Sequence, residues 1–447
     1  MKLMHWVMAA SFFTASCDLI LVFKLGGTVR FAQIMVLLAM LASIAQMIQH
    51  QAILWSKGAT AMAMWCFFQG VLISQSQATA ISAQLYFLLL FTVIGMFATL
   101  QLYGRSEWLQ PLMKVYLQSF VFVGTFGLFQ LVSPALHLGS FLVTQWIRNP
   151  ELPRINGFSY EPSYFATYLI IGWITIIDLK VSNASIVKGR RWAWAIALLT
   201  AALVSSTSKT AIIFVVMEGL ARLAPFAARI TRNQFCRLQR GSLVVSLPRP
   251  AVFFRVSAIF LVSILLLGLS TRVVDPALLL VGTGLNNTAA HSVTTRRDSF
   301  NDTVEVIRQH PLIGRSLGGV AASNAALHGA KVTNVEELRL YWGFPVPVDI
   351  FAASGLLGFI PFLWFFLAIT FGERQLIHKF WPDERAKWLH ALIRALIFEW
   401  LCLLVDQNLL RVYFWFHVTM VVVVGYSLRY YKPKQLTAES LVPLEQL

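Results

Sequence analysis

Long apolar runs separated by short polar segments occupy most of the chain. The hydrocarbon core of a bilayer is about 30 Å thick, so a helix of about 20 apolar residues can cross it. Runs that approach this length begin near Met4, Phe31, Gly58, Ile81, Val115, Pro162, Trp192, Thr210, Val256, Val346, Leu389 and Val412. The pattern predicts an all-α polytopic membrane protein with about twelve transmembrane helices.

The seventh and eighth runs leave two interpretations open. Both runs are short, and the polar segment SSTSK at residues 205–209 joins them. Two separate spans and a single re-entrant hairpin both fit this pattern. The first run follows a basic start and is longer than the apolar core of a signal peptide, so we expect it to be the first span.

Two longer polar connections divide the chain. We predict N-terminal helices in residues 1–132, a first external loop in 133–157 and central helices in 158–270, which include a basic loop at 222–255. A large external loop follows in 271–344, and C-terminal helices with a tail occupy 345–447. The large loop contains an amphipathic helix that ends before Pro311, with Phe300, Val304 and Ile307 on its apolar face. We expect this helix to lie on the membrane surface.

Composition and charge support a membrane protein and predict its orientation. Only 13% of the residues are charged, against about 25% in soluble domains. Lys and Arg in short loops stay cytoplasmic, and outside the large loop 23 of them lie on the side of the two termini and six on the other. Both termini are therefore predicted to be cytoplasmic. The basic loop and the net charge of +16 need no nucleic acid, because anionic lipid headgroups account for them.

Several kinds of catalytic site have no signature in this sequence. There is no glycine-rich phosphate loop, HExxH, nucleophile elbow or pair of CxxC segments. The histidines are scattered, without a spacing that suits a metal. We therefore predict neither nucleotide hydrolysis nor a metal or other cofactor.

The external segments carry many cations. Arginine binds phosphate or diphosphate well because its planar guanidinium makes bidentate, charge-assisted hydrogen bonds. For any single arginine, an interfacial side chain that reaches for lipid headgroups is the simpler interpretation. Together these side chains predict an anion-binding surface, and they are Arg148, Arg154, Lys209, Arg296, Arg297, Arg308, Arg315 and Arg339.

Two carboxylates lie where external loops enter spans. Glu161 precedes Pro162 at the mouth of the sixth span, and Asp349 lies at the entry to the tenth. Each is a candidate general base for an acceptor hydroxyl or an orienting group for a sugar, although Glu161 also suits a helix N-terminus by charge alone. Tyr160 and Tyr164 are candidates for stacking on sugar rings, and membrane-interface anchoring is the alternative.

Five segments resemble, in order, the superfamily of O-antigen ligases and Wzy-type polysaccharide polymerases. They are RINGFSYEPSYFATYL, SSTSKTAIIF, TRRDSFNDTVEVIRQHPLIGRSLGG, ASGLLGFIPFLWFF and DQNLLRVYFWFHVTM, which together cover roughly residues 150–425. In the second segment Lys209 replaces the arginine that is typical of the family. Each motif alone is degenerate, and their combination is more specific.

The resemblance implies a GT-C-type membrane glycosyltransferase of the bacterial inner membrane that needs neither nucleotide nor metal. Its substrate would be an oligosaccharide on undecaprenyl diphosphate, held by arginines and transferred to an acceptor hydroxyl at the periplasmic face. A chain-length-regulating co-polymerase is a further partner that the family implies.

One departure from the family pattern favours a polymerase. In the ligases that attach O-antigen to lipid A core, a His-Asn pair lies about eleven residues before the glycine that corresponds to Gly355, but here Phe344 and Pro345 occupy those positions. His328 keeps the ligase as an alternative. A lipid-linked sugar transporter is a third interpretation, which the concentration of charge in external loops disfavours because transporters place ionisable groups at mid-depth.

Overall fold

A computed structural model describes residues 2–24, 28–148, 151–208, 211–222, 289–338, 340–381, 383–404, 406–407 and 409–431. This part of the chain is mostly helical, with two small antiparallel sheets. The predicted span near Val256 lies outside the described residues. The predicted all-α class is therefore confirmed in its main feature, and the two sheets are additions to it.

The first half of the chain contains both sheets. Its elements are α1 (Lys2–Phe13), β1 (Val22–Lys24), β2 (Thr28–Arg30), α2 (Phe31–His50), α3 (Ala59–Leu72), the 3-10 turn η1 (Ile73–Gln75), α4 (Thr79–Tyr103), α5 (Leu109–Val132), β3 (Gln145–Arg148), β4 (Glu151–Arg154), α6 (Pro162–Val181), the 3-10 turn η2 (Ser185–Val187) and α7 (Arg191–Ser205). Residues 211–222 are also helical. Each sheet is a hairpin, β1 with β2 and β3 with β4.

In the second half, helices are the only regular elements among the described residues, and loops join them. Its elements are α11 (Ala289–Gln309), α12 (Gly319–Leu327), α13 (Val335–Leu338), α14 (Val346–Thr370), α15 (Arg374–Phe380), α16 (Glu384–Cys402) and α17 (Val412–Tyr430).

Six helices among the described residues are long and apolar enough to cross a membrane, so the protein is a multi-pass membrane protein. They correspond to Phe31–His50, Thr79–Tyr103, Leu109–Val132, Pro162–Val181, Val346–Phe380 and Val412–Tyr430. Other predicted spans are shorter helices, such as α1 with 12 residues, α3 with 14 and α7 with 15. The count of twelve spans stays a prediction.

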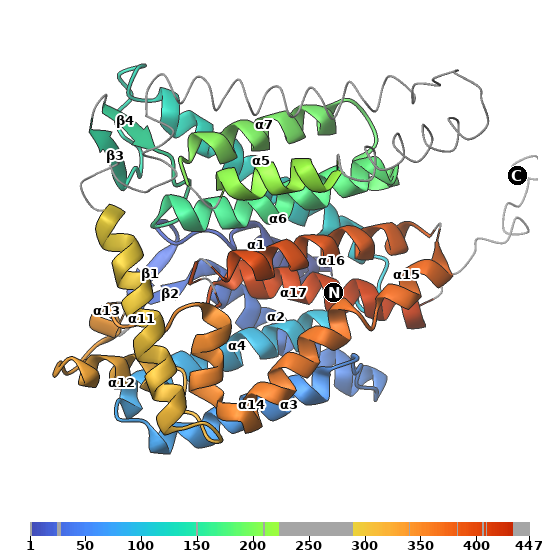
Figure 1. The fold of residues 1–447 in the computed structure, drawn as a ribbon. Coiled ribbons are helices and arrows are strands. Elements are labelled where there is room, and N and C mark those ends of the chain that lie inside the picture. The colour runs from blue at the N-terminus through green and yellow to red at the C-terminus, as the bar shows by residue number, and fades with distance from the viewer. Residues whose placement is uncertain are drawn as a thin grey trace, which may run out of the picture.

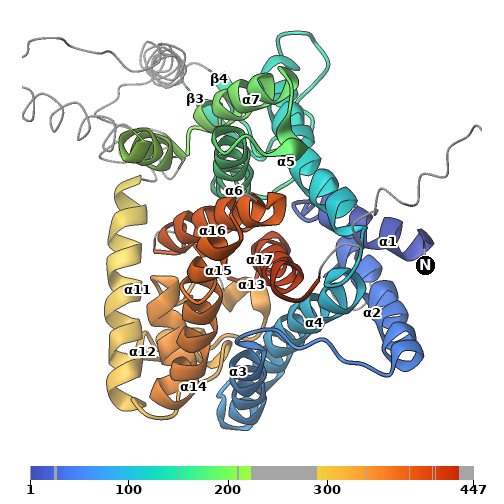
Figure 2. The same ribbon diagram turned by 90° about the vertical axis from the view of Figure 1, so that its right-hand side faces the viewer.

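The long helices run side by side, and both β hairpins lie with α11, α12 and α13 at one end of the bundle (Figure 1). We call this the hairpin end. α17 lies in the middle of the bundle (Figure 2). In its apolar window 94% of the residues are buried, against 22% in α2. α17 is therefore the core of the bundle, whereas α2 presents most of its surface outward.

The predicted amphipathic helix exists as α11, but its packing differs from the expectation. It ends at Gln309, before Pro311, as predicted. Within residues 296–309, Thr303 and Val306 are buried, whereas Phe300 is 40% exposed. Val306 packs with Val320 of α12 and with Ala352 and Ala353 of α14, and Ile307 of the predicted stripe packs against the same cluster. The buried face of α11 is therefore centred on Val306 and not on Phe300, because α11 packs against neighbouring helices, which the periodicity of one segment cannot reveal.

α14 is broken near its middle, and the chain after α11 fills the break. Gly355 has a φ of +57°, which interrupts the helix and which favours glycine over other residues. Here the backbone N–H of Leu356 donates to Pro311, and those of Arg315 and Ser316 donate to Ala352 and Ala353. A Cβ atom on Gly355 would lie 2.4 Å from the carbonyl oxygen of Leu312. The irregular backbone is thus paired inside the protein, as membrane depth requires.

Candidate functional site

Polar side chains from five distant parts of the sequence gather at the hairpin end. We call this group the hairpin-end cluster, and its members are Asp18, Arg30, Arg154, Glu161, Tyr164, Arg296, Asp349, Asp406, Gln407 and Arg411. The segments that carry them precede or begin α2, α6, α14 and α17, or belong to α11. The helix starts therefore bring these side chains to one face of the bundle.

Asp18 connects three of these segments. Its carboxylate accepts a hydrogen bond from Arg30 Nε at 2.8 Å and one from Arg411 Nη1 at 2.9 Å. Its backbone N–H donates to the carbonyl oxygen of Phe158 at 2.9 Å, just before α6. Asp18 is only 4% exposed. It compensates two partly buried cations and connects the loop before α6 to the segment after α1.

Arg411 covers Tyr164 at the start of α6. Its guanidinium carbon lies 3.8 Å from the centre of the tyrosine ring, which is a close cation–π contact. Burial disfavours the charge on Arg411, but Asp18 and Tyr164 outweigh it and raise the pKa of the guanidinium above its ordinary value. Arg411 is therefore a fixed positive charge, and the carboxylate of Asp18 already pairs with it.

Arg154 is partly buried, and its hydrogen-bond partners are neutral. It ends β4, where its Nε donates to Thr207 Oγ1 at 3.0 Å and its Nη1 donates to Gln145 Oε1 at 2.6 Å. Among the described residues, no carboxylate lies within 4.0 Å of it. Burial lowers the pKa of its guanidinium, and the nearby charge of Glu161 opposes that shift. Arg154 thus presents a desolvated positive charge without a short ion pair.

Glu161 lies at the mouth of α6, as predicted. It is the residue before the first helical turn, and Pro162 follows it within that turn. Its side chain is exposed, and Ser163 Oγ donates to it at 3.3 Å. Tyr160 beside it is 37% exposed. Glu161 is therefore accessible to a ligand that approaches Arg154.

Asp349 lies in the first turn of α14, where an amide is its partner. Gln407 Nε2 donates to Asp349 Oδ2 at 3.1 Å and also to the carbonyl oxygen of Gly343. In the part of the chain that the structure describes, no basic side chain pairs with Asp349. Beside it, Arg296 of α11 lies 3.8 Å from Asp406, and its guanidinium carbon lies 5.4 Å from the centre of the Phe344 ring.

The predicted site residues separate into three groups. Arg154, Glu161, Tyr164, Arg296 and Asp349 belong to the hairpin-end cluster, with Tyr160 at its edge. Three arginines make no contact with the cluster: Arg308 pairs with Glu305 at 3.5 Å, Arg315 donates to the carbonyl oxygen of Gln75 at 3.5 Å, and Arg297 is exposed on α11. Lys209, Arg339 and the side chain of Arg148 lie outside the described residues.

The sequence interpretation missed several members of the cluster. Asp18, Arg30, Asp406 and Arg411 were not among the predicted site residues. Asp18 carried a usable signal, because it is the one charged residue within the first four predicted spans, and charges inside spans usually have a function. Arg411 lies in a segment of the family resemblance, DQNLLRVYFWFHVTM.

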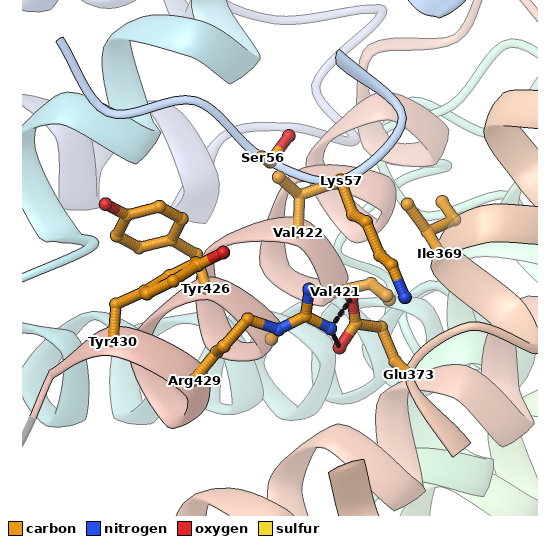
Figure 3. A pocket seen from close by; sticks show the side chains of 10 residues that line it. Ser56, Lys57, Ile369, Glu373, Val421, Val422, Tyr426, Arg429 and Tyr430 are labelled. Atoms are coloured by element: carbon orange, nitrogen blue, oxygen red, sulfur yellow. Dashed lines mark hydrogen bonds and ion pairs between the residues drawn. The ribbon is translucent and has the colours of Figure 1, made fainter. Parts of the chain in front are cut away.

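A pocket at the opposite end of the bundle is a weaker candidate. Lys57, Glu373, Tyr426, Arg429 and Tyr430 line it (Figure 3). Arg429 Nη2 donates to both carboxylate oxygens of Glu373, at 3.0 and 2.9 Å. The guanidinium of Arg429 is therefore already paired with a carboxylate of the same pocket.

The hairpin-end cluster combines a partly desolvated cation, two carboxylates that make no ion pair with any described residue, and a position at the end of apolar helices. Such a site can hold an anionic group attached to a lipid and can orient or deprotonate a hydroxyl beside it. Neither protein-family models nor curated protein sequences gave a match to this chain.

Proposed function

We propose that this protein is a membrane glycosyltransferase that joins oligosaccharide repeat units carried on undecaprenyl diphosphate. The proposal combines the resemblance to Wzy-type polymerases with the hairpin-end cluster. The reaction would take place at the periplasmic face of the bacterial inner membrane, with both termini in the cytoplasm.

The observation that carries the proposal is Arg154. Among the described residues, its two hydrogen-bond acceptors are neutral oxygens, Thr207 Oγ1 and Gln145 Oε1. A partly buried guanidinium without a short ion pair is a strong site for an external anion, because an incoming phosphate restores the missing charge balance. Thr207 belongs to the SSTSK segment, so Arg154 also joins two of the segments on which the resemblance rests.

The proposed roles of these residues follow from the charge that develops on the diphosphate during the transfer. In the transfer, the bond between the sugar and the diphosphate oxygen breaks, and a bond from the acceptor oxygen to the same sugar carbon forms. Negative charge grows on the diphosphate as it leaves, and a fixed guanidinium beside it stabilises the transition state. The proton of the acceptor hydroxyl passes to a carboxylate, for which Asp349 and Glu161 are the candidates.

Reconstituted protein tests the proposal. Purified protein in liposomes that contain lipid-linked repeat units should lengthen the saccharide chains without ATP, as gel electrophoresis of the products would show. Arg154→Ala should lower the rate about 10²- to 10³-fold, the usual cost of removing one group that stabilises charge in a transition state. The rate of Arg154→Lys should lie between those of the wild type and Arg154→Ala, because lysine keeps the charge but loses the bidentate geometry.

Arg374→Ala is the matched control. Arg374 is an exposed arginine on α15, away from the hairpin-end cluster, so its loss should leave the rate unchanged. Wild-type rates in Arg154→Ala would contradict the assigned role. Movement of labelled lipid across the bilayer without chain growth would instead indicate a transporter.

His328 supports a ligase as the second candidate. Its Nε2 lies 2.8 Å from Asp302 Oδ2, and a carboxylate partner is a common feature of histidines that act as general bases. A ligase would transfer the glycan to a lipid A core acceptor, so an assay with both acceptors distinguishes the two activities.

A further inference from the structure

Glu399 is a carboxyl group inside the helix bundle without a hydrogen-bond partner. It lies on α16, which packs against α6 and α17 (Figure 2). None of its surface is exposed, and both of its carboxyl oxygens lack a partner among the described residues. It lies three residues before the last residue of α16, or about 5 Å along the helix axis at 1.5 Å per residue.

In the described part of the chain, no basic side chain lies within ion-pair distance of Glu399. Those within electrostatic reach of it or of its immediate neighbours are Tyr116 of α5, Tyr168 of α6, Tyr413 and His417 of α17, Cys402 of α16, and Asp406 beyond it. Both ring nitrogens of His417 have partners, namely the hydroxyl of Tyr116 at 2.7 Å and the carbonyl oxygen of Leu392 at 2.9 Å. His417 therefore does not serve as a partner for Glu399.

An ionised carboxylate is very costly in such surroundings. Transfer of an isolated charge into an apolar interior costs much more than protonation of the group, so the group takes up a proton instead. Ionisable side chains within membrane helices are rare, and they commonly belong to proton pathways. Burial and the missing partner thus both indicate that a proton is bound to Glu399.

The end of α16 places Glu399 near the hairpin end. Cys402 is the last residue of this helix, and Asp406 and Gln407 of the hairpin-end cluster follow within five residues. Along its own helix, Glu399 is therefore nearer to the hairpin end than to the opposite end of the bundle.

We propose that Glu399 is a proton-binding site inside the bundle that exchanges its proton with the hairpin end. On release, the O–H bond of the Glu399 carboxyl breaks and a water oxygen at the hairpin end accepts the proton. One proton moves and no electrons are transferred. This site does not depend on the proposed sugar transfer.

Carbodiimide labelling tests the site directly. Dicyclohexylcarbodiimide reacts with protonated carboxyl groups in apolar surroundings, and mass spectrometry identifies the modified residue. With full-length protein in oriented liposomes, we expect labelling of Glu399. Its rate should follow the pH on the hairpin-end side and should fall about tenfold for each pH unit above the midpoint, as the protonated fraction falls.

A variant and a matched control identify the labelled group. Glu399→Gln should abolish labelling of this peptide. Glu384→Gln is the control, because Glu384 begins the same helix and its side chain is 35% exposed, so its loss should leave the labelling of Glu399 unchanged.

Three results would overturn the proposal: no labelling of Glu399 at any pH, labelling that does not change with pH, and labelling that follows only the pH on the side away from the hairpins. Infrared spectroscopy of the wild type provides a second measurement that needs no variant. The C=O stretch of a protonated carboxyl should be present, should shift in ²H₂O and should disappear at alkaline pH.

Discussion

Charged side chains have different partners at the two ends of the helix bundle. Towards the end away from the hairpins, Asp178 and Glu218 each pair with both Arg222 and Arg394, at 2.5 to 2.7 Å. At the hairpin end, Arg154 has neutral hydrogen-bond partners in the described part of the chain. The first group is a closed network of two carboxylates and two guanidiniums, and the second leaves charge uncompensated.

This difference separates structural charges from charges that are available to a ligand. A closed network satisfies its own members, and breaking it leaves a buried charge without a partner. An open group is less favourable in the absence of ligand and becomes satisfied when an ion of the opposite sign binds. The group of Asp18, Arg30 and Arg411 is intermediate between the closed and the open group, because one carboxylate pairs with two guanidiniums.

The largest effect on stability should come from the closed network. Arg394→Ala leaves Asp178 and Glu218, which are 4% and 1% exposed, with Arg222 as their shared cation. Removal of one partner from a buried ion pair typically lowers the free energy of unfolding by about 3–5 kcal/mol. Thermal and denaturant unfolding of the purified protein in detergent would measure the loss.

The control for this prediction is Arg374→Ala on exposed α15. A surface substitution away from such networks should change the free energy of unfolding by no more than about 0.5 kcal/mol. If both variants lost stability equally, the closed network would not hold the helices together.

Arg154→Ala should cost much less stability. Its two hydrogen bonds join neutral acceptors, and both Thr207 and Gln145 are partly exposed, so water can replace the guanidinium. The expected loss in the free energy of unfolding is about 1 kcal/mol. Undecaprenyl diphosphate should raise the melting temperature of the wild type, as a ligand of the folded state does, but not that of Arg154→Ala. An equal rise in both proteins would show that the lipid binds elsewhere.

Local signals in the sequence predicted much of this fold. Apolar runs placed the starts of α2, α6, α14 and α17 at Phe31, Pro162, Val346 and Val412, where the structure has them. A change from polar to apolar composition marks these starts, so no tertiary information is needed. The predicted apolar face of α11 was right at Ile307 and wrong at Phe300, because the buried face depends on α12 and α14 as packing partners.

The site was only partly predictable, because pairing between distant residues decides which charges remain available. Arg154, Glu161 and Asp349 were found from their positions at loop ends. The contact between Asp18 and Arg411 joins residues 393 positions apart, and no local pattern reveals it. In the sequence Arg154 and Arg394 are both arginines near apolar runs. Their partners, neutral for one and anionic for the other, give them different roles.

The smallest effect should come from the pair of His328 and Asp302, because both side chains lie near the surface and solvent screens them. The hydrogen bond to Asp302 raises the pKa of His328 above its ordinary value. A raised pKa in the folded state means that the pair contributes its full stability below the ordinary histidine pKa and loses it as the pH rises through the raised value.

Asp302→Asn should therefore lower the unfolding temperature slightly at mildly acidic pH and leave it unchanged at alkaline pH, which unfolding curves across a pH series would show. His328→Gln should reproduce this profile, and the double variant should add nothing further. A loss that persists at alkaline pH would mean that Asp302 stabilises the contact between α11 and α12 without the charge of His328.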